Sequence, residues 1–361
     1  MPDTHIFTAA HLHAYMREIL TAAGTQPHIA DEVAEVLVGA NLTGHDSHGL
    51  LRISMYMNLI DNGRIIPAAE PTVIQDNGNS VVMDGNQSHG IYTCMKGTEF
   101  AIARAKEVGI CGVTFKRNEH IGRLGHFVEM AAHAGCVGFV TVGAGQVDGG
   151  NVLAYASRSR TFSTNPIAFG VPTGDDTPYV LDFANSVVAE GKLRVARSKG
   201  TEVADNTIVD KDGRPTNNPL DFYDGGALLP FGGHKGSALL MIPCLLGALS
   251  GNYNFETGRA SGCFVLMMDI SRFTDLEEYK KAVRHFLNTI KETTPADGHD
   301  EVLAPGDFEA RNRVHRLKHG VEVPPKILEE LQEWNDKWGV DLKSVAILPE
   351  DESRYISPQA S

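Results

Sequence analysis

The fold is decided by the stretch GVTFKRNEHIGRLGHFVEMAAHAGCVGFVTVG, residues 112–143. It opens with the short apolar run GVTF and closes with a second one, CVGFVTVG, and both are typical of strands. Between them, HFVEMAAHAG spaces its apolar residues as a helix does and ends at a glycine. A strand, a helix and a strand in succession favour an α/β domain.

The same alternation extends outward from this stretch. On its N-terminal side, SVVMDG predicts a strand and TEFAIARAKEVG a helix. On its C-terminal side we expect short β segments from about residue 165, a loop over 205–233, a helix near 234–250, the strand CFVLMMDI and an amphipathic helix over 275–292. The segment ALLMIPCLLGAL is interpreted as a core helix, and residues 76–269 as a central cofactor-binding α/β region.

Residues 8 to about 62 predict a helical N-terminal region. Thr8 can cap a first helix that Gly24 ends, a second stops near Gly44, and a third begins near Ser47. We assign residues 1–75 to this region and expect it to pack with the C-terminal part, 270–361. That part ends in a helix over 324–338 and a loose tail.

Composition excludes some classes of partner. The 361 residues carry a formal net charge of −13, whereas nucleic acids and anionic membranes require a basic surface. No run approaches the ~20 apolar residues of a membrane span, and the N-terminus lacks the apolar run of a signal peptide. The five scattered cysteines contain no CxxC, which indicates reduced, buried thiols in a cytoplasmic protein.

The segment HDSHGLLR, residues 45–52, carries the first chemical candidates, with three readings. His45 and His48 could hold a metal, although no third ligand pattern accompanies them. The segment could equally be a capped helix start with solvated histidines. In the third reading His48 transfers a proton beside Arg52, which lies four residues on and therefore on the same face of the expected helix, while Ser47 or Asp46 orients the imidazole. That pairing suits a substrate with a carboxylate next to a carbonyl or hydroxyl.

Several glycine-rich turns offer further candidates. Gly143, Gly145 and Gly149 follow a strand, but no helix or acidic residue follows as a Rossmann fingerprint requires. The turns NEHIGRLGHF (118–127) and PFGGHKGSALL (230–240) place glycines ahead of a helix, where backbone amides can receive an anionic group. Each turn could equally be a plain polar connection.

Six motifs occur together in one order: DSHGLLR, NEHIGRLGHF, STNPIAFGVP, VLDFANSVVAEGK, PFGGHKG and APGDFEARNR. In this order the chain resembles, over nearly its whole length, the malate/L-lactate dehydrogenase family that lacks a Rossmann fold. Relatives of that family include ureidoglycolate, sulfolactate and diketogulonate dehydrogenases and piperideine-carboxylate reductase. The resemblance implies an α/β, non-Rossmann NAD(P)-binding fold with an N-terminal helical subdomain, and a homodimer that holds the cofactor near the subunit interface.

The resemblance also implies roles for individual residues. His48 is expected to donate the proton, with Ser47 beside it, while Arg52, Thr164 and Lys192 contact the substrate. The expected contacts of NAD or NADP are His120, Ile121, Gly122, Arg123, Leu124, Asp182, Phe183, Ala184, His234, Lys235, Pro305, Gly306, Asp307 and Arg311, and no metal is expected.

The expected reaction interconverts a small 2-hydroxy acid and its 2-keto acid by hydride transfer. The alternatives are a cyclic-imine reductase of the same family and a metal-dependent lyase or hydrolase that uses His45 and His48. Lys192 stands where the imine-reducing relatives place an aspartate, which favours the hydroxy acid. The motif NEHIGRLGHF begins with NEH where a form that contains Ser is also known, so the residue that contacts the nicotinamide is left open.

Overall fold

The N-terminal part of the chain folds as helices with their apolar stripes turned together. In the computed structural model, which describes residues 5–145 and 150–355, Thr8 caps α1 (Ala9–Ala22) by accepting a hydrogen bond from the backbone N–H of His11. Helix α2 (Pro27–Leu42) packs against α1, and α3 (Ile53–Asp61) follows. The first two predicted helices are confirmed.

The third predicted helix begins later than expected. Two 3-10 turns, Asp46–His48 and Leu50–Arg52, precede α3. The side chain of Asn41, on α2, accepts the backbone N–H of Leu50 (2.9 Å) and donates to Asp46 (2.7 Å). A Cβ atom at Gly49 would lie 2.1 Å from the amide oxygen of Asn41, so only glycine fits there. A contact with another helix therefore bends the segment, and the expectation that His48 and Arg52 share one α-helical face is wrong.

The core of the molecule is a mixed sheet, in which the described strands run in the order β11–β10–β12–β6–β7–β5–β14–β4–β3–β2. Strands β8 and β9 extend from β5 as a hairpin, and β13 pairs with β14. The bounds are β2 (Thr72–Asp76), β3 (Ser80–Asp84), β4 (Ile110–Lys116), β5 (Cys136–Gly145), β6 (Val152–Leu153), β7 (Arg160–Phe162), β8 (Ile167–Val171), β9 (Tyr179–Phe183), β10 (Ile208–Val209), β11 (Pro215–Thr216), β12 (Ala227–Leu228), β13 (Tyr253–Asn254) and β14 (Arg259–Asp269).

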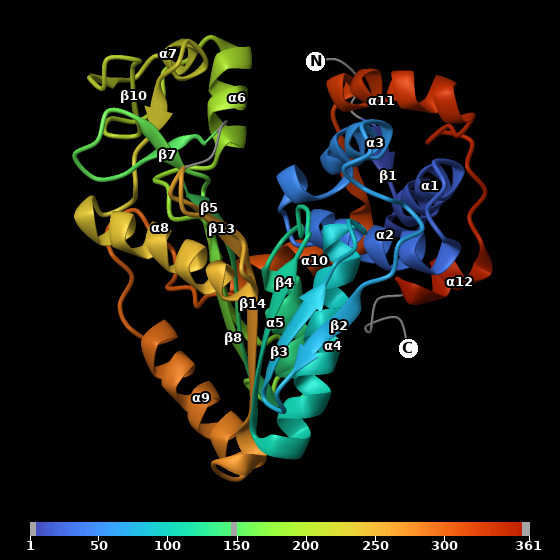
Figure 1. Ribbon diagram of the computed structural model, residues 1–361, viewed down its shortest axis with the longest axis vertical. Helices are drawn as coiled ribbons and strands as arrows, with labels where there is room; N and C mark the ends of the chain where they lie inside the picture. The colour runs from blue at the N-terminus through green and yellow to red at the C-terminus, as the bar shows by residue number, and fades with distance from the viewer. Residues whose placement is uncertain (1–4, 146–149, 356–361) are drawn as a thin grey trace.

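Helices cover both faces of the sheet (Figure 1). Helices α4 (Gly90–Val108) and α5 (Gly125–His133) pack on one face, and α8 (His234–Gly247) packs on the other. Residues 112–143 form β4, α5 and β5, as predicted. Among the described strands, the parallel pairs are β3 with β4 and β12 with β6, so the sheet is not the doubly wound parallel sheet of a Rossmann domain. The predicted non-Rossmann α/β fold is confirmed.

The helices expected near 234–250 and over 275–292 both form. Helix α8 buries Leu240 and Cys244 in a hydrophobic cluster, but it is a core helix on one face only, because Leu245 is 67% and Met241 is 44% exposed. Helix α9 (Leu276–Lys291) is the predicted amphipathic helix, although none of its residues is buried. The expectation of a loop over 205–233 is wrong, because this segment contains β10, β11, β12 and the short helix α7 (Pro219–Tyr223). The five cysteines are free and buried, as predicted, and no described helix is long and apolar enough to cross a membrane.

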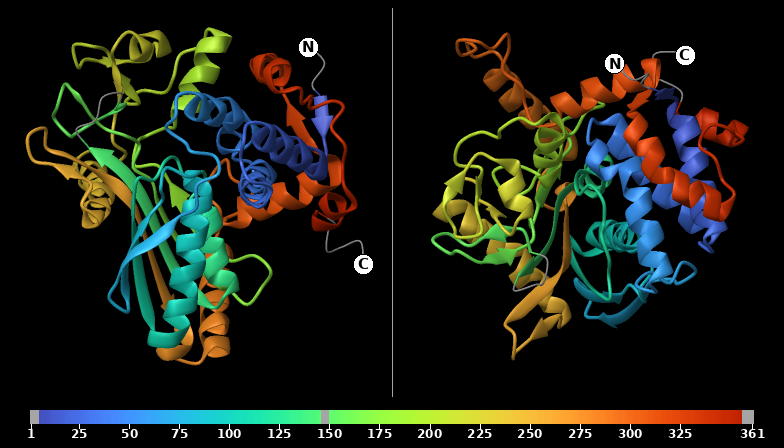
Figure 2. Two further views of the ribbon diagram at one scale, coloured as in Figure 1. Left: turned by 45° about the vertical axis from the view of Figure 1, so that its right-hand side comes forward. Right: turned by 90° about the horizontal axis from the view of Figure 1, so that it is seen from above.

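The C-terminal segment returns to the N-terminal helices (Figure 2). Strand β15 (Val321–Val323) pairs antiparallel with β1 (His5–Phe7), α10 (Asp307–His319) packs on α2, and α11 (Pro325–Trp338) packs on α3. The tail is not loose over α12 (Pro349–Arg354), which packs on α1. The division of the chain at residues 75 and 269 stays a prediction.

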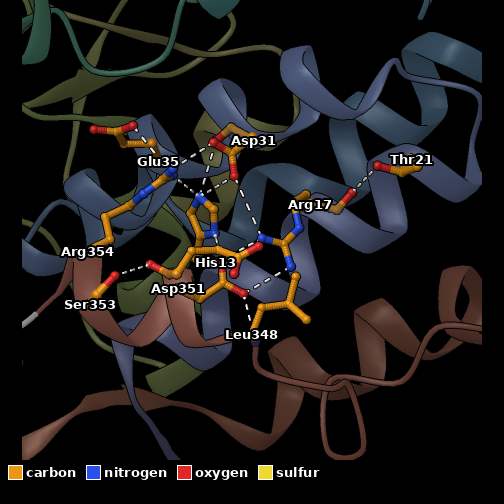
Figure 3. Close-up of polar contacts among 10 residues, drawn as sticks. His13, Arg17, Thr21, Asp31, Glu35, Leu348, Asp351, Ser353 and Arg354 are labelled. Carbon is orange, nitrogen blue, oxygen red and sulfur yellow. Dashed lines mark hydrogen bonds and ion pairs between the residues drawn. The ribbon is translucent and has the colours of Figure 1, made fainter.

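A buried ionic cluster fixes α12 (Figure 3). Asp351, 1% exposed, accepts hydrogen bonds from both terminal nitrogens of Arg17 (2.5 and 3.0 Å). Nδ1 of the buried His13 lies 3.0 Å from Asp351, and its Nε2 lies 2.8 Å from a guanidinium nitrogen of Arg354. Arg354 in turn bonds to Asp31 at 2.8 Å. Because guanidinium groups only donate, Nε2 of His13 is the acceptor and Nδ1 carries the proton.

His13, Asp31 and Asp351 also bring three potential metal-ligand atoms within 4.8 Å of one another. Each of these groups already has an arginine partner. Arg354 donates hydrogen bonds to Nε2 of His13 and to the carboxylate of Asp31, and Arg17 donates to the carboxylate of Asp351. Two guanidinium charges would repel a cation placed here. The cluster therefore serves as an ionic fastener between α1, α2 and α12.

Replacing Asp351 with Asn should lower the free energy of unfolding by about 3 kcal/mol. This value is at the lower end of the range for breaking a buried ion pair, because Arg17 keeps contact with water. Burial raises the pKa of Asp351, but the hydrogen bonds from Arg17 and the backbone of Leu348 outweigh it and hold that pKa below the ordinary value of 3.8. A carboxyl group whose pKa is lower in the folded protein stabilises the fold at pH values above its unfolded pKa. The loss of stability in Asp351→Asn should therefore be full above about pH 5 and shrink below about pH 4. Urea unfolding at several pH values measures it. Glu352→Gln, an exposed neighbour, is the control; equal loss in both variants would contradict the assignment.

Candidate active site

The turn of residues 45–52 is held from two sides. Asn41 fixes it from α2, and Arg316, on α10, donates to both carboxylate oxygens of Asp46 at 2.7 and 3.0 Å. Nε2 of His45 lies 3.0 Å from a carboxylate oxygen of Glu309, also on α10. The turn is therefore clamped between an N-terminal helix and a C-terminal helix. In this arrangement Asp46 binds Arg316 rather than orienting the imidazole of His48.

His48 stands on this turn with one ring nitrogen occupied. Its Nδ1 lies 3.0 Å from the hydroxyl oxygen of Ser47, and no described residue hydrogen-bonds to its Nε2. Burial lowers the pKa of His48 to about 3, and the positive charge of Arg52 adds to the effect. His48 is therefore neutral at pH 7 in the ligand-free protein.

Arg52 supplies a positive charge that no close ion pair among the described residues neutralises, although the carboxylate of Glu190 acts on it from farther away. Its Nε donates to the carbonyl oxygen of Ser47 at 2.6 Å, and no carboxylate of the described residues lies within 4.0 Å of its guanidinium. Burial lowers its pKa below the ordinary value, yet an arginine stays charged in proteins. The charge of Arg52 depresses the pKa of both His48 and His120, so the three side chains share one region. A half-buried guanidinium in this state is suited to bind an anion bidentately.

His120 stacks on His48, with ring centroids 5.8 Å apart and ring planes inclined by 19°. Its Nδ1 lies 2.8 Å from the hydroxyl of Tyr56 and 3.3 Å from the backbone nitrogen of Gly122. Burial, followed by the charges of Arg52 and His48, holds the pKa of His120 well below 6.5. Both imidazoles are thus neutral, and each leaves its Nε2 for a ligand.

Arg123 and Asp182 lie deeper in the same region. Arg123 is 4% exposed and donates to Glu129 at 2.7 Å, while its Nε lies 4.0 Å from Asp182. Asp182, at the end of β9, accepts the backbone N–H of Gly125, at the start of α5, at 2.7 Å. Burial raises the pKa of Asp182, and Arg123 opposes this. The turn after β4 and the end of β9 therefore meet.

The start of α6 (Glu190–Lys199) borders the turn as well. A Cβ atom on Gly191 would lie 3.9 Å from Cβ of Ser47, so the backbone of α6 passes beside Ser47. The side chain of Lys192, the next residue, is exposed. On the other side, the backbone carbonyl of Thr164 accepts the N–H of Asn185 at 2.9 Å, next to Ala184. The segment of Lys192 therefore borders the turn, whereas the contact of Thr164 places it beside the chain that follows β9.

The other residues expected to contact NAD or NADP include Phe183, at the end of β9, and His234 and Lys235, at the start of α8. Phe183 packs edge-on against Phe231 at 5.4 Å. His234 packs against Tyr155 at 5.9 Å; the side chains of His234 and Lys235 are exposed, and none of their described contacts reaches His48.

The segment 305–311 packs against β9 and begins α10. Gly306 packs so closely on the carbonyl of Pro178 that a Cβ atom would lie 2.7 Å from it, and its φ is +102°. Asp307 bonds to Lys291 and to the backbone N–H of Ala304, and Arg311 pairs with Glu301. Gly143 and Gly145 lie within β5, whereas Gly149 lies outside the described residues.

A cavity of about 320 Å³ adjoins this region between α2, α5 and α10. Its lining includes Glu129, which pairs with Arg123, and Glu309, which bonds to His45. Gly306 and Val180 form another part of its wall. His48, Arg52 and His120 are not among its lining residues, so the cavity lies beside the imidazoles and reaches β9 at Val180.

Sequence reasoning missed four residues that build the site: Asn41, Tyr56, Glu309 and Arg316. Tyr56 lies four residues after Arg52 and could have been found by extending the helical spacing. Glu309 and Arg316 lie in or beside the motif APGDFEARNR, but nothing local links them to residues 45 and 46. Tertiary packing alone brings them together.

A neutral imidazole with a free nitrogen beside an unpaired guanidinium is the arrangement of an enzyme that exchanges a proton with a small organic anion. Comparison with known proteins supports an enzyme of this kind. The family model for malate/L-lactate dehydrogenase matches residues 7–332. The chain therefore belongs to the malate/L-lactate dehydrogenase family and is an oxidoreductase of the hydroxy-acid dehydrogenase type.

Individual relatives cover almost the whole chain. An L-lactate dehydrogenase of Cupriavidus necator is 34% identical over 329 residues, which span 88% of this chain and 93% of that protein. A malate dehydrogenase structure from Entamoeba histolytica superposes with a TM-score of 0.87 at 26% identity, over 96% of this chain and 100% of that one. A structure of delta1-piperideine-2-carboxylate reductase from Pseudomonas syringae gives 0.79 at 29% identity, over 92% and 100%.

Proposed function

We propose that the protein interconverts a 2-hydroxy acid and its 2-keto acid by NAD(P)-dependent hydride transfer, with His48 as proton donor and acceptor. The observation that carries this proposal is the unpaired guanidinium of Arg52 beside the free Nε2 of His48. The fork of Arg52 takes the substrate carboxylate, and Nε2 of His48 faces the carbonyl or hydroxyl oxygen. Thr164 and Lys192 contact the rest of the substrate.

The substrate itself makes His48 a proton donor. In the free protein His48 is neutral, with a pKa of about 3, which suits a base for oxidation but not an acid for reduction. A carboxylate bound to Arg52 compensates the positive charge that lowers the pKa of His48 and adds a negative charge near the ring, and both effects raise that pKa. The bound keto acid thus creates the imidazolium that its own reduction requires, and Ser47 holds the other ring nitrogen.

Buried polar atoms without partners support a dinucleotide in this region. Both amide atoms of Asn118 and Nε of Arg123 are buried and unbonded among the described residues, two and three residues from His120. A ligand with several polar groups can satisfy such atoms. When bound, the dinucleotide supplies or accepts the hydride. The segment 120–124, Asp182 to Ala184, His234, Lys235 and the segment 305–311 are the residues proposed to hold it.

Reduction of a cyclic imine is the second candidate, because the piperideine-carboxylate reductase structure shares the fold. Lys192, a cation, favours the keto acid, since a protonated imine carries a positive charge. Metal-dependent chemistry at His45 and His48 is disfavoured, because Nε2 of His45 is occupied by Glu309. The reduced thiols fit our proposal of a cytoplasmic protein.

The proposal is tested by following the oxidation of NADH and of NADPH by the purified protein with 2-keto acids, keto diacids and cyclic imines, with and without chelator. We expect activity with 2-keto acids, unaffected by chelator. Arg52→Lys should raise KM at least about tenfold, because a point charge cannot reproduce bidentate binding. His48→Gln should lower kcat about 100-fold. Turnover of imines alone, loss of activity with chelator, or full activity in both variants would overturn it.

We also propose that the protein is a homodimer. An apolar surface remains exposed on α8 and the β13–β14 hairpin, where Leu245 is 67% and Phe255 is 90% exposed, with Leu249 and Tyr253 between them. Helix α9 has no buried residue, although Phe286 and Ile290 lie on it. A monomer rarely exposes apolar side chains in such groups, and a second copy of the chain would cover them.

Light scattering on a size-exclusion column should give the mass of two chains. Leu245→Glu combined with Phe255→Glu should shift the mass toward one chain, because burying two carboxylates in an apolar interface is unfavourable. Glu256→Gln, on the exposed hairpin, is the control. A single-chain mass for the unaltered protein would contradict the dimer.

A further inference from the structure

We propose that Tyr56 is a positioning residue that, together with the backbone N–H of Gly122, fixes the tautomer of His120, so that His120 presents Nε2–H to a carbonyl oxygen of the bound ligands. The proposal rests on the proposed function for its role in catalysis, but its structural part can be tested without any substrate. Tyr56 lies outside the six sequence motifs of the family, and it is fully buried on α3.

The donors around His120 determine where its proton lies. The backbone N–H of Gly122 can only donate, and it points to Nδ1 from 3.3 Å. Nδ1 is therefore an acceptor, and the hydroxyl of Tyr56, 2.8 Å away, donates to the same nitrogen. Burial raises the pKa of Tyr56, so its phenol keeps the proton that it donates. With Nδ1 occupied as an acceptor, the neutral ring carries its hydrogen on Nε2.

The surroundings keep His120 from gaining a second proton. Arg52 and His48 face it from the 45–52 turn, and both lower its pKa after burial does. His89, the N-cap residue of α4, packs edge-on against Tyr56 with ring centroids 6.1 Å apart, and burial lowers its pKa to about 4. Glu119, the carboxylate next to His120 in the chain, is paired with Arg64. No described carboxylate bonds to His120, so nothing near it stabilises an imidazolium.

The two stacked imidazoles therefore have different tasks. His48 has a hydroxyl at Nδ1 that can donate or accept, so its ring can change its protonation state. The Nδ1 lone pair of His120 is engaged by two donors, so His120 stays a neutral donor through Nε2–H. A neutral imidazole held in this way can polarise a carbonyl oxygen without transferring its proton. Either the substrate carbonyl or a carboxamide carbonyl of the dinucleotide can be this acceptor.

The tautomer can be read directly from ¹⁵N chemical shifts of histidine-labelled, ligand-free full-length protein. We expect Nδ1 of His120 to resonate as an unprotonated nitrogen and Nε2 as a protonated one, with His120→Gln providing the assignment. In Tyr56→Phe the pattern should move toward a mixture of tautomers, because only the longer bond from Gly122 remains. A wild-type His120 that is protonated on Nδ1, or charged, would overturn the proposal. Because this readout needs no turnover, it can fail or succeed independently of the proposed function.

Steady-state kinetics then test whether the bond between Tyr56 and His120 matters for catalysis. Tyr56→Phe should lower kcat about tenfold with less than a twofold change in KM, since the Arg52 contact is kept. Tyr15→Phe is the matched control, because Tyr15 is also fully buried and its hydroxyl makes one hydrogen bond, to Asn335 at 2.7 Å. The control should retain its kcat. An equal loss in both variants, or a shifted tautomer with unchanged kcat, would show that Tyr56 has only a structural role.

Discussion

The guanidinium of Arg52, half-buried and without a carboxylate partner, is the charge on which the site depends. Together with burial, which is the larger cause, it lowers the pKa of two stacked imidazoles, so both are neutral in the free protein and we propose that a bound anion changes the protonation of His48 alone. An arginine paired within the protein would have no such effect, because its charge would already be compensated. The site is thus prepared for a small carboxylate, and the same electrostatic term that binds the substrate also changes the protonation of His48.

The position of this charge depends on contacts between the two ends of the chain. Asn41 bends the turn from α2, and Arg316 and Glu309 hold Asp46 and His45 from α10. Farther out, the cluster of His13, Arg17, Asp31, Asp351 and Arg354 fixes α12 to α1 and α2. The C-terminal segment therefore belongs to the scaffold of the site, although it contributes no residue to the proton transfer.

Local patterns predicted much of the fold, and they failed where tertiary contacts decide. Strand β4, helix α5 and strand β5 follow from periodicity within residues 112–143. The bend at Gly49 does not, because its cause is the side chain of Asn41 on another helix. The docking of α12 joins residues 13 and 351, which no local signal connects. Periodicity finds the apolar residues of α8 but cannot distinguish a face that meets the core from one that stays exposed. His48 and Arg52 were predicted as neighbours, but their local structure was not.

The most direct test is the proton balance of ligand binding. Oxamate, a 2-keto-acid analogue that cannot be reduced, is titrated into the protein with NADH at pH 6, by calorimetry in buffers of different ionisation enthalpy. If its carboxylate compensates Arg52 and raises the pKa of His48, binding takes up a fraction of a proton per site from the buffer. The account predicts this uptake in the unaltered protein and its loss in His48→Gln. Binding without proton uptake, or the same uptake in the variant, would contradict it.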